Sequence, residues 1–99
     1  MLNINKTKEE TKLNIALEGR LDTTTSPQLE EEIRADIEGV TELNFDLGEL
    51  AYISSAGLRV LLASQKIMNE QGTMTVCNVS SEIMEIFEMT GFSEILTIQ

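Results

Sequence analysis

The spacing of apolar residues switches repeatedly between two and nearly four along this chain, and this switching restricts the fold more than any other feature. Alternation of apolar and polar residues, typical of strands with one buried face, is found in residues 2–5, 12–19 and 41–47. Leu29, Ile33 and Ile37 instead recur every four residues, which is typical of a helix with one buried stripe. Strands that alternate with helices predict an α/β domain with a largely parallel or mixed sheet.

Capping residues and glycines predict where the elements begin and end. Ser26 followed by Pro27 predicts a helix start, because a hydroxyl caps free N–H groups and proline fits the first turn. Ser80 or Ser81 is expected to cap the last helix. The predicted order is strands 2–5 and 12–19, helix 26–38, strand 41–47, a connection over 48–52, helix 55–71, strand 73–79, helix 81–90 and strand 94–98. We therefore expect one domain over residues 1–99, with about four to five strands and covering helices.

Charge and hydropathy exclude several classes of partner. The 99 residues hold 7 basic and 17 acidic side chains, a net charge of −10, which repels phosphate backbones and anionic lipids. We expect no nucleic acid and no membrane among the partners, but a protein with a basic contact patch. No apolar run reaches the length of a membrane span, and the first ten residues lack the apolar core of a signal peptide. A cytoplasmic protein is expected.

The inventory of reactive side chains argues against an enzyme. Histidine is absent and Cys77 is the single cysteine, so histidine triads, histidine metal sites and internal disulfides are excluded. Cys77 lies in a predicted buried strand, where a cysteine acts as a small apolar residue. The carboxylates fall mainly in runs such as Glu30–Glu32, which suit the first turns of a helix. We expect no catalytic residues, no metal and no cofactor.

Two serines, Ser54 and Ser55, stand where a strand is expected to join the helix over 55–71. Either hydroxyl could cap the helix by accepting a bond from a free backbone N–H. Alternatively, one hydroxyl is the functional atom of the protein. The stretch lacks the lysine of a phosphate-binding loop and is not a Gly-x-Ser-x-Gly nucleophile elbow.

The helix over 55–71 carries apolar residues on two sides. One side holds Leu58, Leu61, Leu62 and Met68, and the roughly opposite side holds Val60, Ala63 and Ile67. One side must face the sheet. The other is expected either to pack on a neighbouring helix or to form a surface for a partner.

Three segments, in order and at matching spacing, resemble the STAS family, and within it the bacterial anti-sigma factor antagonists. Residues 17–33 are similar to its Gly-x-Leu/Ile-Asp segment, 43–62 to its signature strand, loop and helix, and 79–96 to its C-terminal segment. Alignment on Gly57-Leu58 implies that Ser55 is the serine phosphorylated by a partner kinase. Ser54 stands where the family often has aspartate, and Ala56 where it often has a second hydroxyl.

The resemblance further implies that Asp22 corresponds to an aspartate near the phosphorylation site, although it could equally be an ordinary turn residue. It implies a switch that binds an anti-sigma factor serine/threonine kinase, frees a sigma factor, and releases the kinase once phosphorylated. A serine phosphatase would restore binding. Two alternatives remain open at this point: a STAS subunit of a signalling scaffold or transporter accessory complex, and a small-molecule or nucleotide-binding domain.

Overall fold

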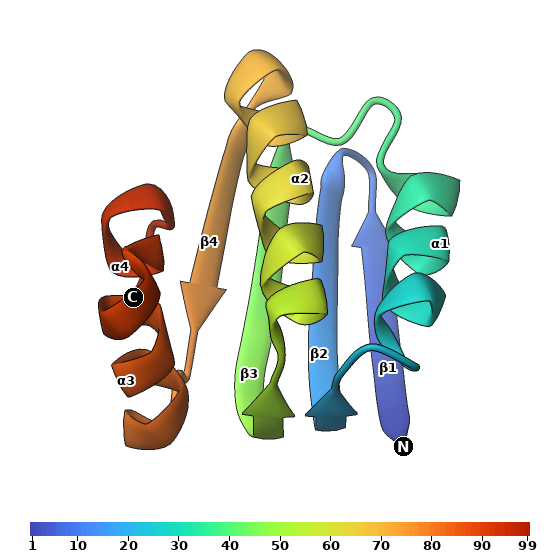
Figure 1. The fold of residues 1–99 in the computed structure, drawn as a ribbon. Coiled ribbons are helices and arrows are strands. Elements are labelled where there is room, and N and C mark those ends of the chain that lie inside the picture. Colours follow the sequence, from blue (N-terminus) through green and yellow to red (C-terminus); the bar gives the residue numbers. More distant parts are fainter.

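The computed structural model describes residues 1–99 and shows a four-stranded sheet with helices packed against it (Figure 1). The elements are β1 (Leu2–Glu9), β2 (Lys12–Leu21), α1 (Ser26–Asp36), β3 (Glu42–Ile53), α2 (Ser55–Gln71), β4 (Thr73–Cys77), α3 (Ser81–Thr90) and α4 (Phe92–Ile95). The mixed sheet with covering helices confirms the fold class expected from the sequence.

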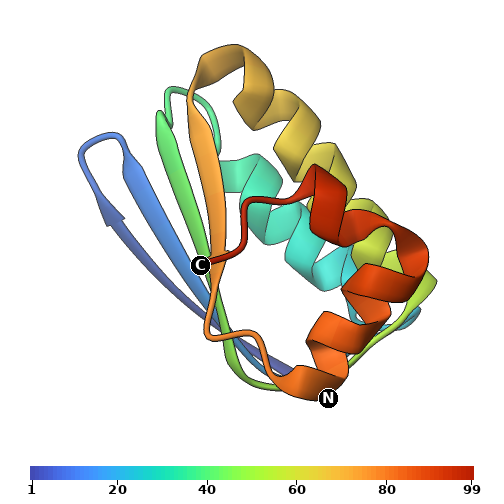
Figure 2. The same ribbon diagram turned by 90° about the vertical axis from the view of Figure 1, so that its left-hand side faces the viewer.

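The strands follow one another in the sheet in the order β1-β2-β3-β4. The β1–β2 hairpin is antiparallel, whereas β2, β3 and β4 are parallel, so α1 and α2 serve as the crossovers between them. Figure 2 shows that all the helices lie on one face of the sheet. Because parallel strands end at the same edge, the segments that follow β2 and β3 come together there.

A single apolar core fills the space between the sheet and the helices. It comprises 23 buried residues, among them Leu13, Ile15 and Leu17 of β2 and Phe45 of β3. The alternate side chains of these strands point to the other face, which carries amides, hydroxyls and charges. This division between an apolar and a polar face explains why alternation in the sequence identified the strands.

Strand β3 is longer than the sequence indicated, because the expected connection over 48–52 is part of the strand. Ala16 pairs with Asp46 while Glu18 pairs with Glu49, so β3 holds one extra residue there, and a second register shift follows at residues 19–20. Because of these bulges, every third residue in this part of β3 points into the core, instead of every second residue. The buried residues Leu47, Leu50 and Ile53 therefore recur every three positions, which does not match the two-residue alternation of a regular strand.

The C-terminus departs from the expected last strand over 94–98. Residues Phe92–Ile95 form the short helix α4, and only Ile98 forms an isolated parallel bridge, to Val76. The backbone N–H of Val76 donates to Thr97 at 2.9 Å, and that of Gln99 donates to Val76 at 2.9 Å. The sheet consequently has four strands. The left-handed Gly91, with φ of 82°, separates α3 from α4.

Two smaller expectations about side chains were also wrong. Ser26 does not cap α1: Thr25 is the cap residue, and the Ser26 hydroxyl donates to the carbonyl oxygen of Asp22 at 2.6 Å. Cys77 is half-buried on the polar face of the sheet rather than enclosed in the core. Its neighbour Val76 takes the inward position, since successive strand residues point to opposite faces.

The two apolar sides of α2 have different surroundings. Leu58, Leu61 and Met68 are buried toward the sheet, as expected. On the second side Val60 is buried, and with Ile33 and Ile37 of α1 it lines a shallow hollow between the two helices. The neighbouring-helix alternative therefore holds for Val60. Further along this side, Ala63 is exposed and Ile67 retains 41% of its surface.

Candidate functional site

The carboxyl ends of β2 and β3 bring the candidate residues together. Leu21 and Ile53, the last residues of these strands, are partners in the parallel register. Immediately beyond them, the backbone N–H of Ser54 donates to the carbonyl oxygen of Leu21 at 2.9 Å. This bond holds the residue after β3 beside Asp22, the residue after β2. Ligands and partners of open parallel sheets commonly bind at such strand ends.

The structure gives Ser54 and Ser55 different roles. Ser54 is the cap of α2: its backbone is extended, and its hydroxyl oxygen accepts from the N–H of Gly57 at 3.4 Å. Ser55 is the first residue of the helix, and its side chain is exposed and has no hydrogen bond within the protein. The cap therefore occupies one hydroxyl and leaves the other free to react.

Gly57 and Leu58 hold the start of α2 against the sheet. A Cβ atom on Gly57 would lie 2.8 Å from Cγ of Leu21 and 2.9 Å from Cγ1 of Ile53, so only glycine fits without a shift. Leu58 is buried in the core, and Ala56 is half-buried. These three residues accordingly fix the position of Ser55, while Ser55 itself faces solvent.

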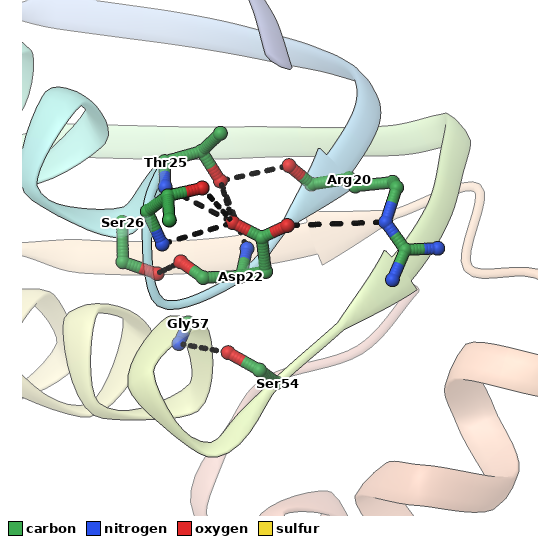
Figure 3. A network of polar contacts seen from close by, with 7 residues as sticks. Arg20, Asp22, Thr25, Ser26, Ser54 and Gly57 are labelled. Carbon is green, nitrogen blue, oxygen red and sulfur yellow. Dashed lines mark hydrogen bonds and ion pairs between the residues drawn. The ribbon is translucent and has the colours of Figure 1, made fainter. Parts of the chain in front are cut away.

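Asp22 builds the turn that leads into α1. Its Oδ1 accepts from the backbone N–H groups of Thr24 and Thr25, at 3.0 and 3.1 Å, and from both of their hydroxyls, at 2.8 and 3.1 Å (Figure 3). The single proton of the Thr25 hydroxyl is shared between Asp22 and the carbonyl oxygen of Arg20, which lies 2.8 Å away. Asp22 thus adopts the turn role that the sequence left open, and it does so directly beside the start of α2.

These bonds also fix the charge of Asp22. Donation from the Thr24 hydroxyl, together with the backbone bonds, outweighs partial desolvation and lowers the pKa of the Asp22 carboxyl from 3.8 to about 2. The group is therefore ionised at neutral pH. A carboxylate with this pKa and this set of donors is suited to holding the turn rather than to taking a proton from Ser55.

Sequence reasoning missed the neighbours of Asp22 on the polar face of the sheet. The Nε of Arg20 lies 3.8 Å from Oδ2 of Asp22, and its guanidinium carbon lies 4.3 Å from the centre of the Tyr52 ring. Tyr52 belongs to the bulged end of β3, so its place opposite Arg20 follows from the register. The Asp-x-Thr-Thr pattern was an available turn signal, whereas no local pattern pointed to the Arg20–Tyr52 pair.

The start of α2 is well placed to carry a negative group on Ser55. The first N–H groups of a helix lack partners inside it, and the helix dipole favours an anion there. A second pair with the same arrangement begins α3, where Ser80 caps by accepting from the N–H of Ile83 at 3.2 Å and Ser81 is exposed. An exposed serine beside a capping serine is therefore not unique to the start of α2. Ser55 differs from Ser81 because it lies beside the turn that Asp22 builds.

None of the helices combines the length with the apolar character that crossing a bilayer requires.

Comparison with known proteins matches residues 3–99 to the model of the STAS domain. BtrV of Bordetella bronchiseptica is 38% identical over 84 residues, which cover 83% of this chain and 72% of BtrV. The anti-sigma-B factor antagonist of Listeria monocytogenes is 30% identical over 97 residues, covering 95% of this chain and 84% of that protein.

Solved structures share the fold. An anti-sigma factor antagonist from Mycobacterium paratuberculosis superposes with a TM-score of 0.89 at 19% identity, over 99% of this chain and 85% of that one. The phosphorylated form of the Bacillus cell fate determinant SpoIIAA superposes with a TM-score of 0.77 at 19% identity, over 98% of this chain and 91% of that one. The match to the domain model over nearly the whole chain and the two sequence relatives agree, and the chain belongs to the STAS-domain family.

Proposed function

We propose that this chain is an anti-sigma factor antagonist whose binding is switched by phosphorylation of Ser55. Unphosphorylated, it binds an anti-sigma factor that is also a serine kinase, and the sigma factor held by that partner is freed. The kinase then transfers the γ-phosphoryl group of ATP to the Ser55 oxygen, leaving ADP, and the phosphorylated chain dissociates. A serine phosphatase returns it to the binding state.

The observation that carries this proposal is the free, exposed hydroxyl of Ser55 beside a serine that already caps the helix. Phosphorylation of Ser55 leaves the Ser54 cap in place, so the fold has no need to change. A phosphate adds about −1.5 to −2 charges at neutral pH. Burying such a group against a partner costs several kcal/mol unless basic groups meet it, and about 4 kcal/mol is a thousandfold in affinity.

The nucleotide and the catalytic groups belong to the partner in this proposal. The chain acts by binding, with no cofactor or metal of its own, and it works in the cytoplasm, where ATP and sigma factors are found. Highly purified chain should therefore show no ATPase or phosphatase turnover. Turnover that disappears when a residue of this chain is changed would contradict the proposal.

Binding of the cognate kinase, measured by titration calorimetry, tests the switch. Ser55→Asp should weaken binding, because charge at this position is proposed to break the interface, and Ser55→Ala should bind like the parent. Ser81→Asp is the matched control, since it places the same charge at the first residue of α3, beside a capping serine. If folded Ser55→Asp binds as tightly as the parent, the switch lies elsewhere.

The acceptor itself is tested by mapping the phosphate with mass spectrometry after incubation with the kinase and ATP. We expect one principal site, Ser55, and no incorporation in Ser55→Ala. Ser54 and Ser80 are engaged as caps, while Ser81 is the exposed alternative. Phosphate found mainly on Ser54, Ser80 or Ser81 would overturn the assignment.

A further inference from the structure

Three of the seven basic side chains of this acidic protein have no carboxylate partner: Lys8, Arg59 and Lys66. Of the seven, four form ion pairs with Asp or Glu: Lys6, Lys12, Arg20 and Arg34. Arg59 forms neither an ion pair nor a side-chain hydrogen bond, although the chain holds 17 acidic residues. Of the three arginines, Arg20 and Arg34 are paired and only Arg59, on α2, has no carboxylate partner.

Arg59 lies one helical turn beyond Ser55. Four residues correspond to about 6 Å along the axis and about 40° around it, so the two positions are neighbours on one face. Both side chains are exposed. Side chains of a helix lean toward its N-terminus, so an arginine at position 59 can reach a group attached at position 55.

The surroundings leave this arginine available. With Ala56 and Thr23 it lines an open hollow between the starts of α1 and α2. The carboxylate of Glu30, which lines the same hollow, and that of Asp22, in the turn before α1, are both engaged. Glu30 pairs with Arg34 at 3.5 Å, and Asp22 accepts four bonds from its own turn.

We propose that Arg59 is the intramolecular counter-ion of phosphorylated Ser55. This inference rests on the proposed function, in which Ser55 carries the phosphate. The guanidinium donates to the phosphate oxygens from the same helix, in the paired geometry that favours arginine at phosphate sites. Phosphorylation then changes two features of the contact surface at once: it adds an anion, and it withdraws a cation that was free to meet a carboxylate of the partner.

The test needs no kinase. Phosphoserine is incorporated at position 55 of the full chain by genetic code expansion, and the second pKa of the phosphate, ordinarily about 6, is followed by phosphorus NMR. An exposed pair favours the dianion, so we expect this pKa to be about 0.2–0.7 units higher in Arg59→Gln than in the parent. The difference should shrink in high salt, since exposed charges are screened.

Lys66→Gln is the matched control. It removes the same charge from the same helix, and the separation of eleven positions between Ser55 and Lys66 places it about 20° away around the axis but about 16 Å along it. That separation exceeds the screening length of about 8 Å at physiological salt. Lys66 is exposed and unpaired, like Arg59. The phosphate pKa in Lys66→Gln should stay within about 0.1 unit of the parent.

Two results would overturn the proposal: an unchanged phosphate pKa in Arg59→Gln, or equal shifts in Arg59→Gln and Lys66→Gln, which would reveal only a general charge effect. The proposed function fails through a different result. If the chain carrying phosphoserine at position 55 binds the kinase as tightly as the unmodified chain, phosphorylation of Ser55 is not the switch, whatever the titration shows.

Discussion

Replacing Ser54 and Ser55 one at a time by alanine separates their roles by stability alone. Ser54→Ala removes the oxygen that accepts from the N–H of Gly57. Loss of an N-terminal cap costs about 0.5–2 kcal/mol. Because the distance of 3.4 Å is at the long end for a hydrogen bond, we expect about 0.5–1 kcal/mol here.

Ser55→Ala should behave differently, because the Ser55 hydroxyl has no partner to lose and its side chain is exposed. Substitutions at such positions change the free energy of unfolding by no more than about 0.5 kcal/mol. The higher helix propensity of alanine acts in the stabilising direction. From the sequence alone, Ser55→Ala could have removed the helix cap. In the structure Ser54 is the cap, so Ser54→Ala is the variant expected to lose that stability.

The assay is thermal unfolding followed by circular dichroism. One kcal/mol corresponds to about 4–8 °C in Tm for a domain of this size, so Ser54→Ala should lower Tm by about 2–8 °C. Ser55→Ala should change Tm by no more than about 2–4 °C, and in the stabilising direction. Ser80→Ala and Ser81→Ala form the matched pair on α3 and should show the same order, since Ser80 caps and Ser81 does not.

A larger loss of stability in Ser55→Ala than in Ser54→Ala would refute this assignment of the two hydroxyls. Ser54→Ala should also remain a substrate for phosphorylation at Ser55, because the acceptor oxygen is retained. Phosphate appearing elsewhere in this variant would show that the cap also guides the kinase.

Three further predictions follow from the turn at Asp22 and from two close approaches. The lowered pKa of Asp22 means that its carboxylate stabilises the fold above its ordinary value of 3.8, and that this contribution is lost as the pH falls toward about 2. Tm measured across that range should therefore fall more steeply in the parent than in Asp22→Asn, and equal slopes would contradict the turn bonds. Gly57→Ala places a Cβ 2.8 Å from Cγ of Leu21. It should lower the free energy of unfolding by about 1–3 kcal/mol in urea titrations. Unchanged stability would show that the sheet can shift to make room for the new methyl group. Gly72→Ala should cost more, because its Cβ would lie 1.9 Å from the backbone oxygen of Thr41, which has less freedom to move than a side chain. The reverse ranking of the two glycine variants would refute that reasoning.

Local patterns in the sequence determined the elements whose signals lie within a few residues. Helix α2 spans Ser55–Gln71 in the structure, as the serines before it and Gly72 after it indicated. Leu29, Ile33 and Ile37 are buried, as their four-residue spacing predicted. The motifs resembling the STAS family also lie in continuous segments, and for this reason the family could be inferred before the fold was known.

Tertiary structure decided the features that depend on residues distant in the chain. The bulges that extend β3 exist only in its pairing with β2, so no pattern within 48–53 identified them. The short last segment folds as α4 because Phe92 packs on the core, and Ile98 finds its partner in β4. Burial and long-range pairing outweigh local propensity at such places.

The candidate site shows the same division. The sequence marked two hydroxyls at a helix start, since a capping signal is local, but it left open which of them caps. The choice depends on backbone geometry: β3 ends beside β2, the N–H of Ser54 is held by Leu21, and the Ser54 oxygen is thereby directed to Gly57. Parallel pairing of two strands far apart in the chain therefore leaves the Ser55 hydroxyl free.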